Sequence, residues 1–178
     1  MAKFIGIKQL WYTDPLSTAP TQATLSTLVS GATEIKNVHQ DTWGYSQDDP
    51  DVQDYINELT GKPYYRDAQN QGNKTINFTM GEYDYATKAE LQGGSAITES
   101  SKVVGWKAPD NPLLVQKAII ALTKTGTYII FTNAGIVAKG DQQLKAVGLG
   151  VTAVAMENTN GTAQAPISDE YWFDAPSA

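Results

Sequence analysis

Residues 115–156 hold three strand-like runs in close succession, and this stretch constrains the fold more than any other part of the chain. The runs are separated by turn-forming residues and span 115–123, 127–132 and 144–156. In the last run, aliphatic side chains alternate with small or mixed ones, which is typical of a strand covered on at least one face. We expect turns at 124–126 and in the gap that holds Gly135 and Gly140. Strands that follow one another through turns indicate an antiparallel sheet.

The remainder of the chain adds short elements of both kinds. Alternating apolar and polar side chains predict strands at 4–13, 32–43, 74–80 and 102–106. Apolar residues at helical spacing predict a short helix over 21–30 that ends at Gly31. A second helix is expected over 85–92, because Asp84 can cap its start and Gly93 can end it.

Composition narrows the functional class. Of the 178 residues, 41% are hydrophobic and 18% are charged, which excludes a disordered chain and fits one domain over 1–178. The absence of cysteine excludes disulfides, zinc–thiolate sites and cysteine nucleophiles. The 13 basic residues are unclustered and outnumbered by 19 acidic ones, so stable nucleic-acid binding is not expected. Because no stretch suits a signal peptide or a membrane span, we expect a soluble chain made in the cytoplasm.

An acidic segment is the most unusual local feature. Between residues 41 and 60 there is no Lys or Arg, but there are six carboxylates: Asp41, Asp48, Asp49, Asp51, Asp54 and Glu58. The spaced carboxylates and distant glutamate of a calcium loop are missing, so we expect no metal site here. A solvated acidic loop is one interpretation, and a charge-matched contact surface is its functional version.

Two secondary structures compete within this acidic segment. Four apolar residues recur at the spacing of one helical face, namely Val52, Tyr55, Ile56 and Leu59. The aromatic residues on either side, at 43–45 and 64–65, fit one long hairpin instead. The sequence therefore leaves open whether 52–59 is helix or strand.

No constellation of catalytic side chains is evident. His39 is the only histidine, and although a strand would place it on the same face as Asp41, no G-x-S-x-G motif exists to complete a triad. The G-x-G-x-x-A pattern at 148–153 lies inside an expected strand, whereas a dinucleotide site needs a strand to end and a helix to begin there. We therefore expect neither enzymatic activity nor a cofactor.

Aromatic residues offer the remaining binding chemistry. The chain has four Trp, nine Tyr and four Phe, which in a β-sandwich could form a platform for sugar stacking. Trp and Tyr are also enriched in cores and at subunit contacts, so packing is the more usual role. A carbohydrate-binding module with a β-sandwich fold is the alternative to a structural function.

Several segments occur in an order that resembles a known family. Residues 74–80 read K-T-I-N-F-T-M, and residues 83–94 combine a short helix with a terminal double glycine. The segments that follow are Gly105 with Trp106, 117–124, 128–134 and the expected strand at 148–155. In this order they resemble the tail tube (major tail) proteins of long-tailed bacteriophages, which are related to the type VI secretion tube protein.

The resemblance implies a fold and an assembly. The fold would be mainly β, with two packed antiparallel sheets, sandwich- or barrel-like, and one or two short flanking helices. The subunits would form hexameric rings that stack into a tube, within a virion tail that contains other phage tail proteins. DNA would pass transiently through the lumen, and the net charge of −6 fits this role because a negative wall repels phosphates. No active site and no cofactor are implied.

Tube proteins often carry an extended loop or hairpin between early strands that contacts the next ring. The resemblance places this feature at residues 45–66, over the acidic segment. The residues expected to make the inter-ring contact are Trp43, Tyr45, Asp48, Asp49, Asp51, Asp54 and Glu58.

Overall fold

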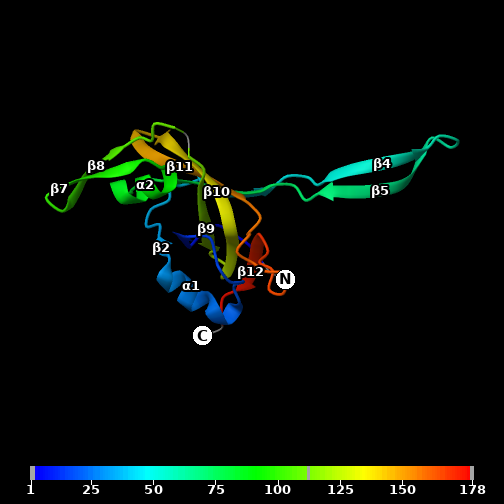
Figure 1. The fold of residues 1–178 in the computed structure, drawn as a ribbon, viewed down its shortest axis with the longest axis horizontal. Helices are drawn as coiled ribbons and strands as arrows, with labels where there is room; N and C mark the ends of the chain where they lie inside the picture. Colours follow the sequence, from blue (N-terminus) through cyan, green and yellow to red (C-terminus); the bar gives the residue numbers. More distant parts are fainter. Residues whose placement is uncertain (1–2, 112, 177–178) are drawn as a thin grey trace.

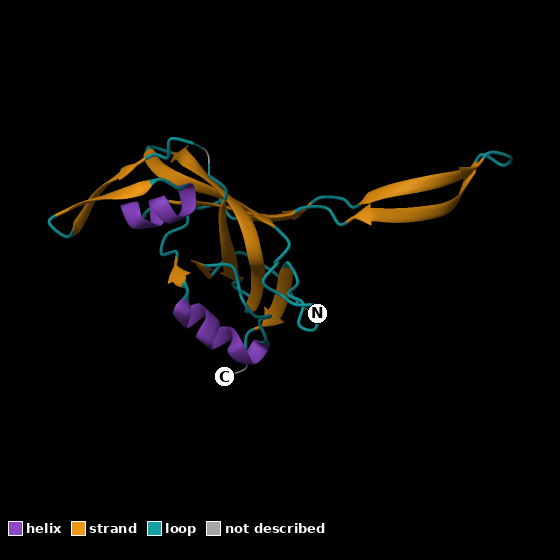
Figure 2. Ribbon diagram, in the orientation of Figure 1, coloured by secondary structure: helices purple, strands orange, loops and turns teal. Residues whose placement is uncertain are grey.

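Antiparallel strands make up most of the structure, a computed structural model that describes residues 3–111 and 113–176 (Figures 1 and 2). The strands of the main sheet are β1 (Gln9–Thr13), β2 (Thr33–Glu34), β3 (Gly44–Gln47), β6 (Lys74–Met80), β9 (Val115–Leu122), β10 (Thr127–Gln143), β11 (Ala146–Ala155) and β12 (Glu170–Asp174). Two separate hairpins pair β4 (Asp51–Asn57) with β5 (Lys62–Asn70), and β7 (Ser95–Glu99) with β8 (Lys102–Lys107). The helical segments are η1 (Gln22–Thr24), α1 (Leu25–Gly31) and α2 (Tyr85–Gln92). The prediction of a mainly β fold with short helices is confirmed.

The main sheet folds into two layers that share strand β10. Its order is β2-β1-β9-β10-β11-β6-β3, and β12 also pairs with β10. The part of β10 up to Phe131 pairs with β12, whereas the part from Ala134 onward pairs with β11. The register against β9 shifts between these two residues, and such an irregularity bends a strand. We call β2, β1, β9, β12 and the start of β10 the first layer, and the remainder of the sheet the second layer.

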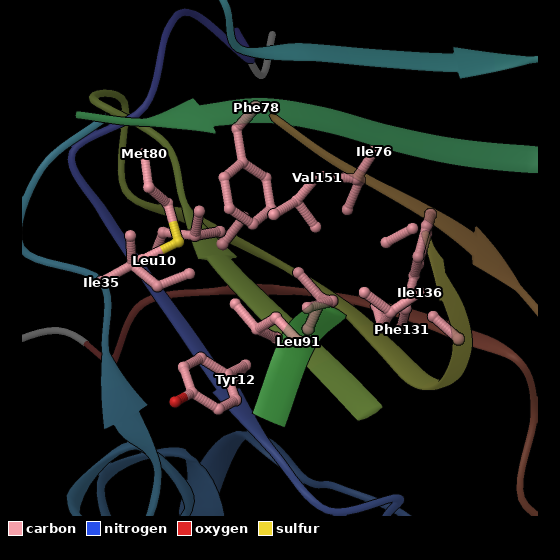
Figure 3. Close-up of a cluster of buried hydrophobic side chains, with 14 of the residues drawn as sticks. Leu10, Tyr12, Ile35, Ile76, Phe78, Met80, Leu91, Phe131, Ile136 and Val151 are labelled. Atoms are coloured by element: carbon pink, nitrogen blue, oxygen red, sulfur yellow. The ribbon is translucent and has the colours of Figure 1, made fainter. Parts of the chain in front are cut away.

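Alternate side chains of both layers meet in the main core (Figure 3). Strand β6 contributes Ile76, Phe78 and Met80, which the sequence predicts to share one face. Phe131 of β10 and Leu91 of α2 enter the same cluster and are fully buried. Full burial of one such side chain stabilises the fold by about 1.5–3 kcal/mol, so this cluster dominates the stability.

The first layer is buried on its outer face as well. There Trp11, Ile120 and Ile130 pack in a second cluster with Leu25 of α1. Strand β9 therefore meets apolar neighbours on both faces. This double burial explains why residues 118–122 are a continuous apolar run instead of an alternating one.

Between β12 of the first layer and β3 and β6 of the second, side-chain contacts join the layers in place of backbone hydrogen bonds. Within the described residues no pairing links β12 to β3 or β6, so the sheet is not a closed barrel. Instead, Lys74 Nζ lies 2.9 Å from Asp169 Oδ2 and 3.4 Å from Glu170 Oε2. Tyr45 and Trp172 both donate to Glu170 Oε1, at 2.8 and 2.7 Å. Burial alone lowers the pKa of Lys74, but the two carboxylates outweigh it and hold that pKa above its ordinary value.

Helix α2 begins and ends where the sequence predicts. The Asp84 side chain accepts a hydrogen bond of 2.7 Å from the Thr87 backbone, which lowers the pKa of Asp84 and caps the helix. Gly93 and Gly94 then adopt positive φ angles of 82° and 89°. Trp106 of β8 donates to the Gly93 carbonyl at 2.9 Å and so fixes the β7–β8 hairpin against the end of the helix.

The strand predicted at 32–43 is wrong except for its start. Only Thr33–Glu34 forms a strand, and after it the backbone turns away from the sheet. Ile35 donates to Leu10 and His39 donates to Thr79, so single hydrogen bonds to two different strands replace a continuous ladder. A positive φ of 63° at Asp41 then excludes extended backbone. The strand predicted at 4–13 likewise begins only at Gln9, after Gly6 with a φ of 60°.

The turn predicted around Gly135 and Gly140 is also wrong, because β10 continues to Gln143. Both glycines pair within the β10–β11 ladder, opposite Val154 and Leu149. A Cβ atom on Gly135 would lie 2.9 Å from Met156 Sδ, so this glycine permits a close approach and does not end the strand. The chain reverses instead at Leu144, whose φ is 55°.

Candidate assembly surface

The β4–β5 hairpin extends away from the rest of the molecule as an arm (Figure 1). We define the arm as residues 48–73. Within the described residues β4 and β5 pair only with each other, and every residue of both strands is at least partly exposed. A hairpin occurs in the region expected, but its strands span 51–70 instead of 45–66, because residues 44–47 form β3 of the main sheet. The helical alternative for 52–59 is wrong, since Asp51–Asn57 is a strand. An isolated helix of that length is unstable without a surface that covers its apolar face, and the arm has none.

Cross-strand contacts hold the arm together. The Arg66 guanidinium donates to both carboxylate oxygens of Asp54, at 2.5 and 2.8 Å, and thereby lowers the pKa of Asp54. The rings of Tyr55 and Tyr65 lie opposite each other with centroids 5.7 Å apart. Both contacts are exposed to solvent, so each adds little to the stability of the arm.

The tip of the arm is a tight turn that presents one apolar side chain. Asn57 accepts hydrogen bonds from the backbone of Leu59 at 2.9 Å and of Gly61 at 2.7 Å. Gly61 has a φ of 66°, which glycine adopts without strain. As a result Leu59 is 96% exposed at the end of the molecule, next to the carboxylate of Glu58.

The base of the arm depends on close backbone contact. Asp48 donates to the Asn73 carbonyl at 2.9 Å. A Cβ atom on Gly72 would lie only 1.9 Å from the Asp48 carbonyl oxygen, so this position accepts only glycine without rearrangement. The two strands of the arm therefore leave the body from adjacent points.

The expected contact residues divide between the arm and the body. Asp48, Asp49, Asp51 and Glu58 are exposed on the arm, and none of them forms an ion pair with a described residue. Asp54 is also on the arm, but its carboxylate already forms an ion pair with Arg66. Trp43 and Tyr45 instead pack against the main core. Burial, reinforced by the nearby Glu170, raises the pKa of Tyr45, which fits a position inside the body.

Exposed apolar side chains on the arm are the feature that sequence reasoning missed. They come from both strands and the tip: Val52, Tyr55, Ile56, Leu59, Tyr64 and Tyr65. In the sequence the first four are spaced like one face of a buried helix. On a two-stranded arm the same residues remain exposed to solvent, without a covering layer in the described part of the chain.

The structure does not assemble a catalytic or metal site from the other candidates. His39 lies in a loop, and its Nε2 atom is buried without a hydrogen-bond partner in the described part of the chain. Asp41 occupies the adjoining turn, so the strand geometry expected to pair it with His39 is absent there. Among residues 3–111 and 113–176, no group of three or more His, Cys, Asp and Glu side chains could hold a metal ion.

Aromatic rings do gather at one hollow in the body. Phe4, Trp43, Tyr45 and Trp172 line a cavity of about 280 Å³. The rings of Phe4 and Tyr45 both meet Trp172 edge to face, with centroids 5.0 and 5.5 Å apart. Because these rings pack on one another, little flat surface is left for a sugar ring to stack upon.

No protein-family model matches this chain, and no curated protein does either. Among the described helices, none has the length and apolar character to cross a bilayer.

Proposed function

We propose that this chain is a structural subunit that assembles with copies of itself into rings, which stack into a tube of the phage tail type. The observation that carries the proposal is the arm, on which no other described part of the chain packs as a covering layer. A two-stranded hairpin with no covering layer is at best marginally stable in water. Contact with another copy supplies the missing cover.

The chemistry of the arm supports contact with another molecule. Its apolar side chains are the kind that stable interfaces bury, and Tyr is enriched among them. The carboxylates of Asp48, Asp49, Asp51 and Glu58 are free to meet cations on a neighbour. The free edges of β2 and β3 in the main sheet are available for lateral contacts within a ring. The net charge of −6 suits a lumen through which DNA slides without binding.

A carbohydrate-binding module is the alternative function. Its support would come from the aromatic hollow around Trp172, where the rings already contact each other. A sugar-binding module also has no need of a projecting hairpin with exposed apolar side chains. The two functions differ in one property that is simple to measure, since only a tube subunit associates with itself at high concentration.

The test compares the wild type with a variant that lacks the arm. Residues 50–71 are replaced by a two-residue turn, which the adjacent strands at the base of the arm allow. Under negative-stain microscopy the concentrated wild type should form rings and tubes, and the armless variant should form no tubes. Both proteins should give the same β-rich circular dichroism spectrum. A wild type that remains monomeric at high concentration would contradict the proposal, and sugar-dependent stabilisation of that monomer would support the alternative.

A further inference from the structure

A second hairpin, β7–β8, projects from the body in the direction opposite to the arm (Figure 1). Its apolar side chains face solvent: Ile97 is 45% exposed, and Val103 and Val104 are each 48% exposed. Trp106, by contrast, is held against the end of α2. The molecule therefore has apolar surface on projections that point in opposite directions.

The β7–β8 hairpin borders a hollow that could receive a side chain. The hollow has a volume of about 400 Å³ and lies between Val103 and the start of α2, where Tyr83, Asp84, Tyr85 and Ala86 line it. Its walls are mostly apolar, and its size exceeds that of a leucine side chain. The single apolar side chain at the tip of the arm, Leu59, is 96% exposed and suits such a hollow.

The charges of the two projections are complementary. Lys102 and Lys107 of β8 form no ion pair with a described residue. Two carboxylates lie near them at α2: Asp84 accepts a hydrogen bond from the start of the helix, and Glu90 accepts one of 2.8 Å from Tyr12. Glu99 of β7 pairs in register with Lys102, so the β7–β8 hairpin has two lysines against one carboxylate. The arm has the opposite net charge, because it contains six carboxylates and only two cations, Lys62 and Arg66.

We infer that the tip of the arm docks on the β7–β8 hairpin of a second copy of this chain. Leu59 enters the hollow beside Val103, and Glu58 faces Lys102. The contact joins unlike surfaces, so every copy offers one arm and one acceptor, and the contact repeats from copy to copy in an open series. This inference rests on the proposed tube function and names the surface that the arm recognises.

Another hollow provides a matched control. It has a volume of about 330 Å³ beside α1, and its lining includes Leu16, Pro20 and Thr27. This hollow is also largely apolar, and its lining has no charged side chain, whereas Lys102 adjoins Val103 of the proposed acceptor in sequence. A comparison of docking at the two hollows therefore distinguishes non-specific apolar contact from the specific docking proposed here.

Cysteine cross-linking tests the contact directly, because the natural chain contains no cysteine. A double variant, Leu59→Cys with Val103→Cys, is concentrated and mildly oxidised. Docking of the arm on the acceptor predicts a ladder of disulfide-linked multimers on a denaturing gel. The control variant, Leu59→Cys with Thr27→Cys, should give no ladder beyond dimers. Equal ladders from the two variants, or a ladder from the control alone, would overturn the inference.

A charge exchange tests the same contact without cross-linking. Glu58→Lys and Lys102→Glu should each reduce light scattering by the concentrated protein, because each places like charges together. The two substitutions combined in one chain should restore the scattering, since the pair is then reversed but intact. Failure of the combination to exceed either single variant would also overturn the inference.

The outcomes separate this inference from the proposed function. If the wild type forms tubes while the Leu59→Cys, Val103→Cys variant gives no ladder, the acceptor surface is wrong and the tube function stands. If the wild type forms no tubes at any concentration, the tube function itself fails.

Discussion

Strands β9 and β4 are both rich in apolar side chains, yet their surroundings are opposite. Residues 118–122 of β9 are buried between the main core and α1. Val52, Tyr55 and Ile56 of β4 are exposed on an arm with no covering layer. The comparison shows that apolar strand residues of one chain can be placed either in the core or on an exposed surface. In β9 they stabilise the fold, and in β4 we infer that they stabilise contact between copies.

The largest effect on stability should come from the core. Phe131→Ala removes a fully buried ring from β10 and leaves a cavity, so the free energy of unfolding should fall by about 3–5 kcal/mol. Tyr65→Ala on the arm is the matched control, and its effect should remain within about 0.5 kcal/mol. Urea denaturation of the unassembled protein measures both values. Equal losses would show that the arm belongs to the cooperative body.

A smaller effect is expected where the arm joins the body. Gly72→Ala places a Cβ atom against the Asp48 carbonyl, so the backbone must shift at a cost of about 1–3 kcal/mol. We expect faster hydrogen exchange across residues 51–70 and shorter tubes, with unchanged exchange in β9. Gly44→Ala is a control, because no atom lies within 4 Å of the Cβ position there. If the exchange of the arm is the same in both variants, the contact at its base does not organise it.

Alkaline pH should weaken the body. Burial raises the pKa of Tyr12 to about 12 from its ordinary value of 10.0. A raised folded-state pKa means that the associated stability is complete below pH 10 and is lost as the pH rises toward 12. Tyr12→Phe removes the hydrogen bond to Glu90 and should cost about 1 kcal/mol at neutral pH. Melting curves from pH 8 to 12 should fall less steeply for the variant; parallel curves would exclude Tyr12 as their cause.

The smallest effect on stability should come from the exposed carboxylates of the arm. Replacing Asp48, Asp49 and Asp51 by Asn should change the free energy of unfolding by less than about 0.5 kcal/mol. Stacking should nevertheless weaken. Added salt should weaken stacking of the wild type in the same direction, because exposed charges are screened over roughly 10 Å at 0.1 M ionic strength. Light scattering across a salt series measures this effect, and equal tube lengths for wild type and variant would dismiss these residues as stacking elements.

The sequence predicted correctly those helices and strands whose bounds depend on neighbouring residues. The strand at 74–80 has the predicted bounds because its alternating side chains meet the core on one face. Helix α2 has the predicted bounds because Asp84 and Gly93 supply both ends. The reversal at Leu144 had no such signal, since neither glycine nor asparagine occupies the position with positive φ.

Tertiary contacts decided what the sequence left open or mispredicted. The apolar spacing of residues 52–59 fits a helix, but pairing with 62–70 makes a strand. The acidic residues of the arm were evident from charge, and the resemblance assigned the inter-ring contact to them. Trp43 and Tyr45 were grouped with it through their nearness in sequence, whereas contacts with the distant β12 draw Tyr45 into the body. No local pattern could have revealed that partner.

The pairing of β1 with β9 has a consequence for how the protein is made. Gln9 pairs with Leu122, so β1 has no partner strand in β9 until more than 100 further residues have been synthesised. The first layer is complete only after β12, close to the C-terminus, has also been made. The arm is the opposite case, because its two strands are adjacent in sequence. In the proposed tube, subunits would therefore be added only after β12 has been made and the first layer is complete.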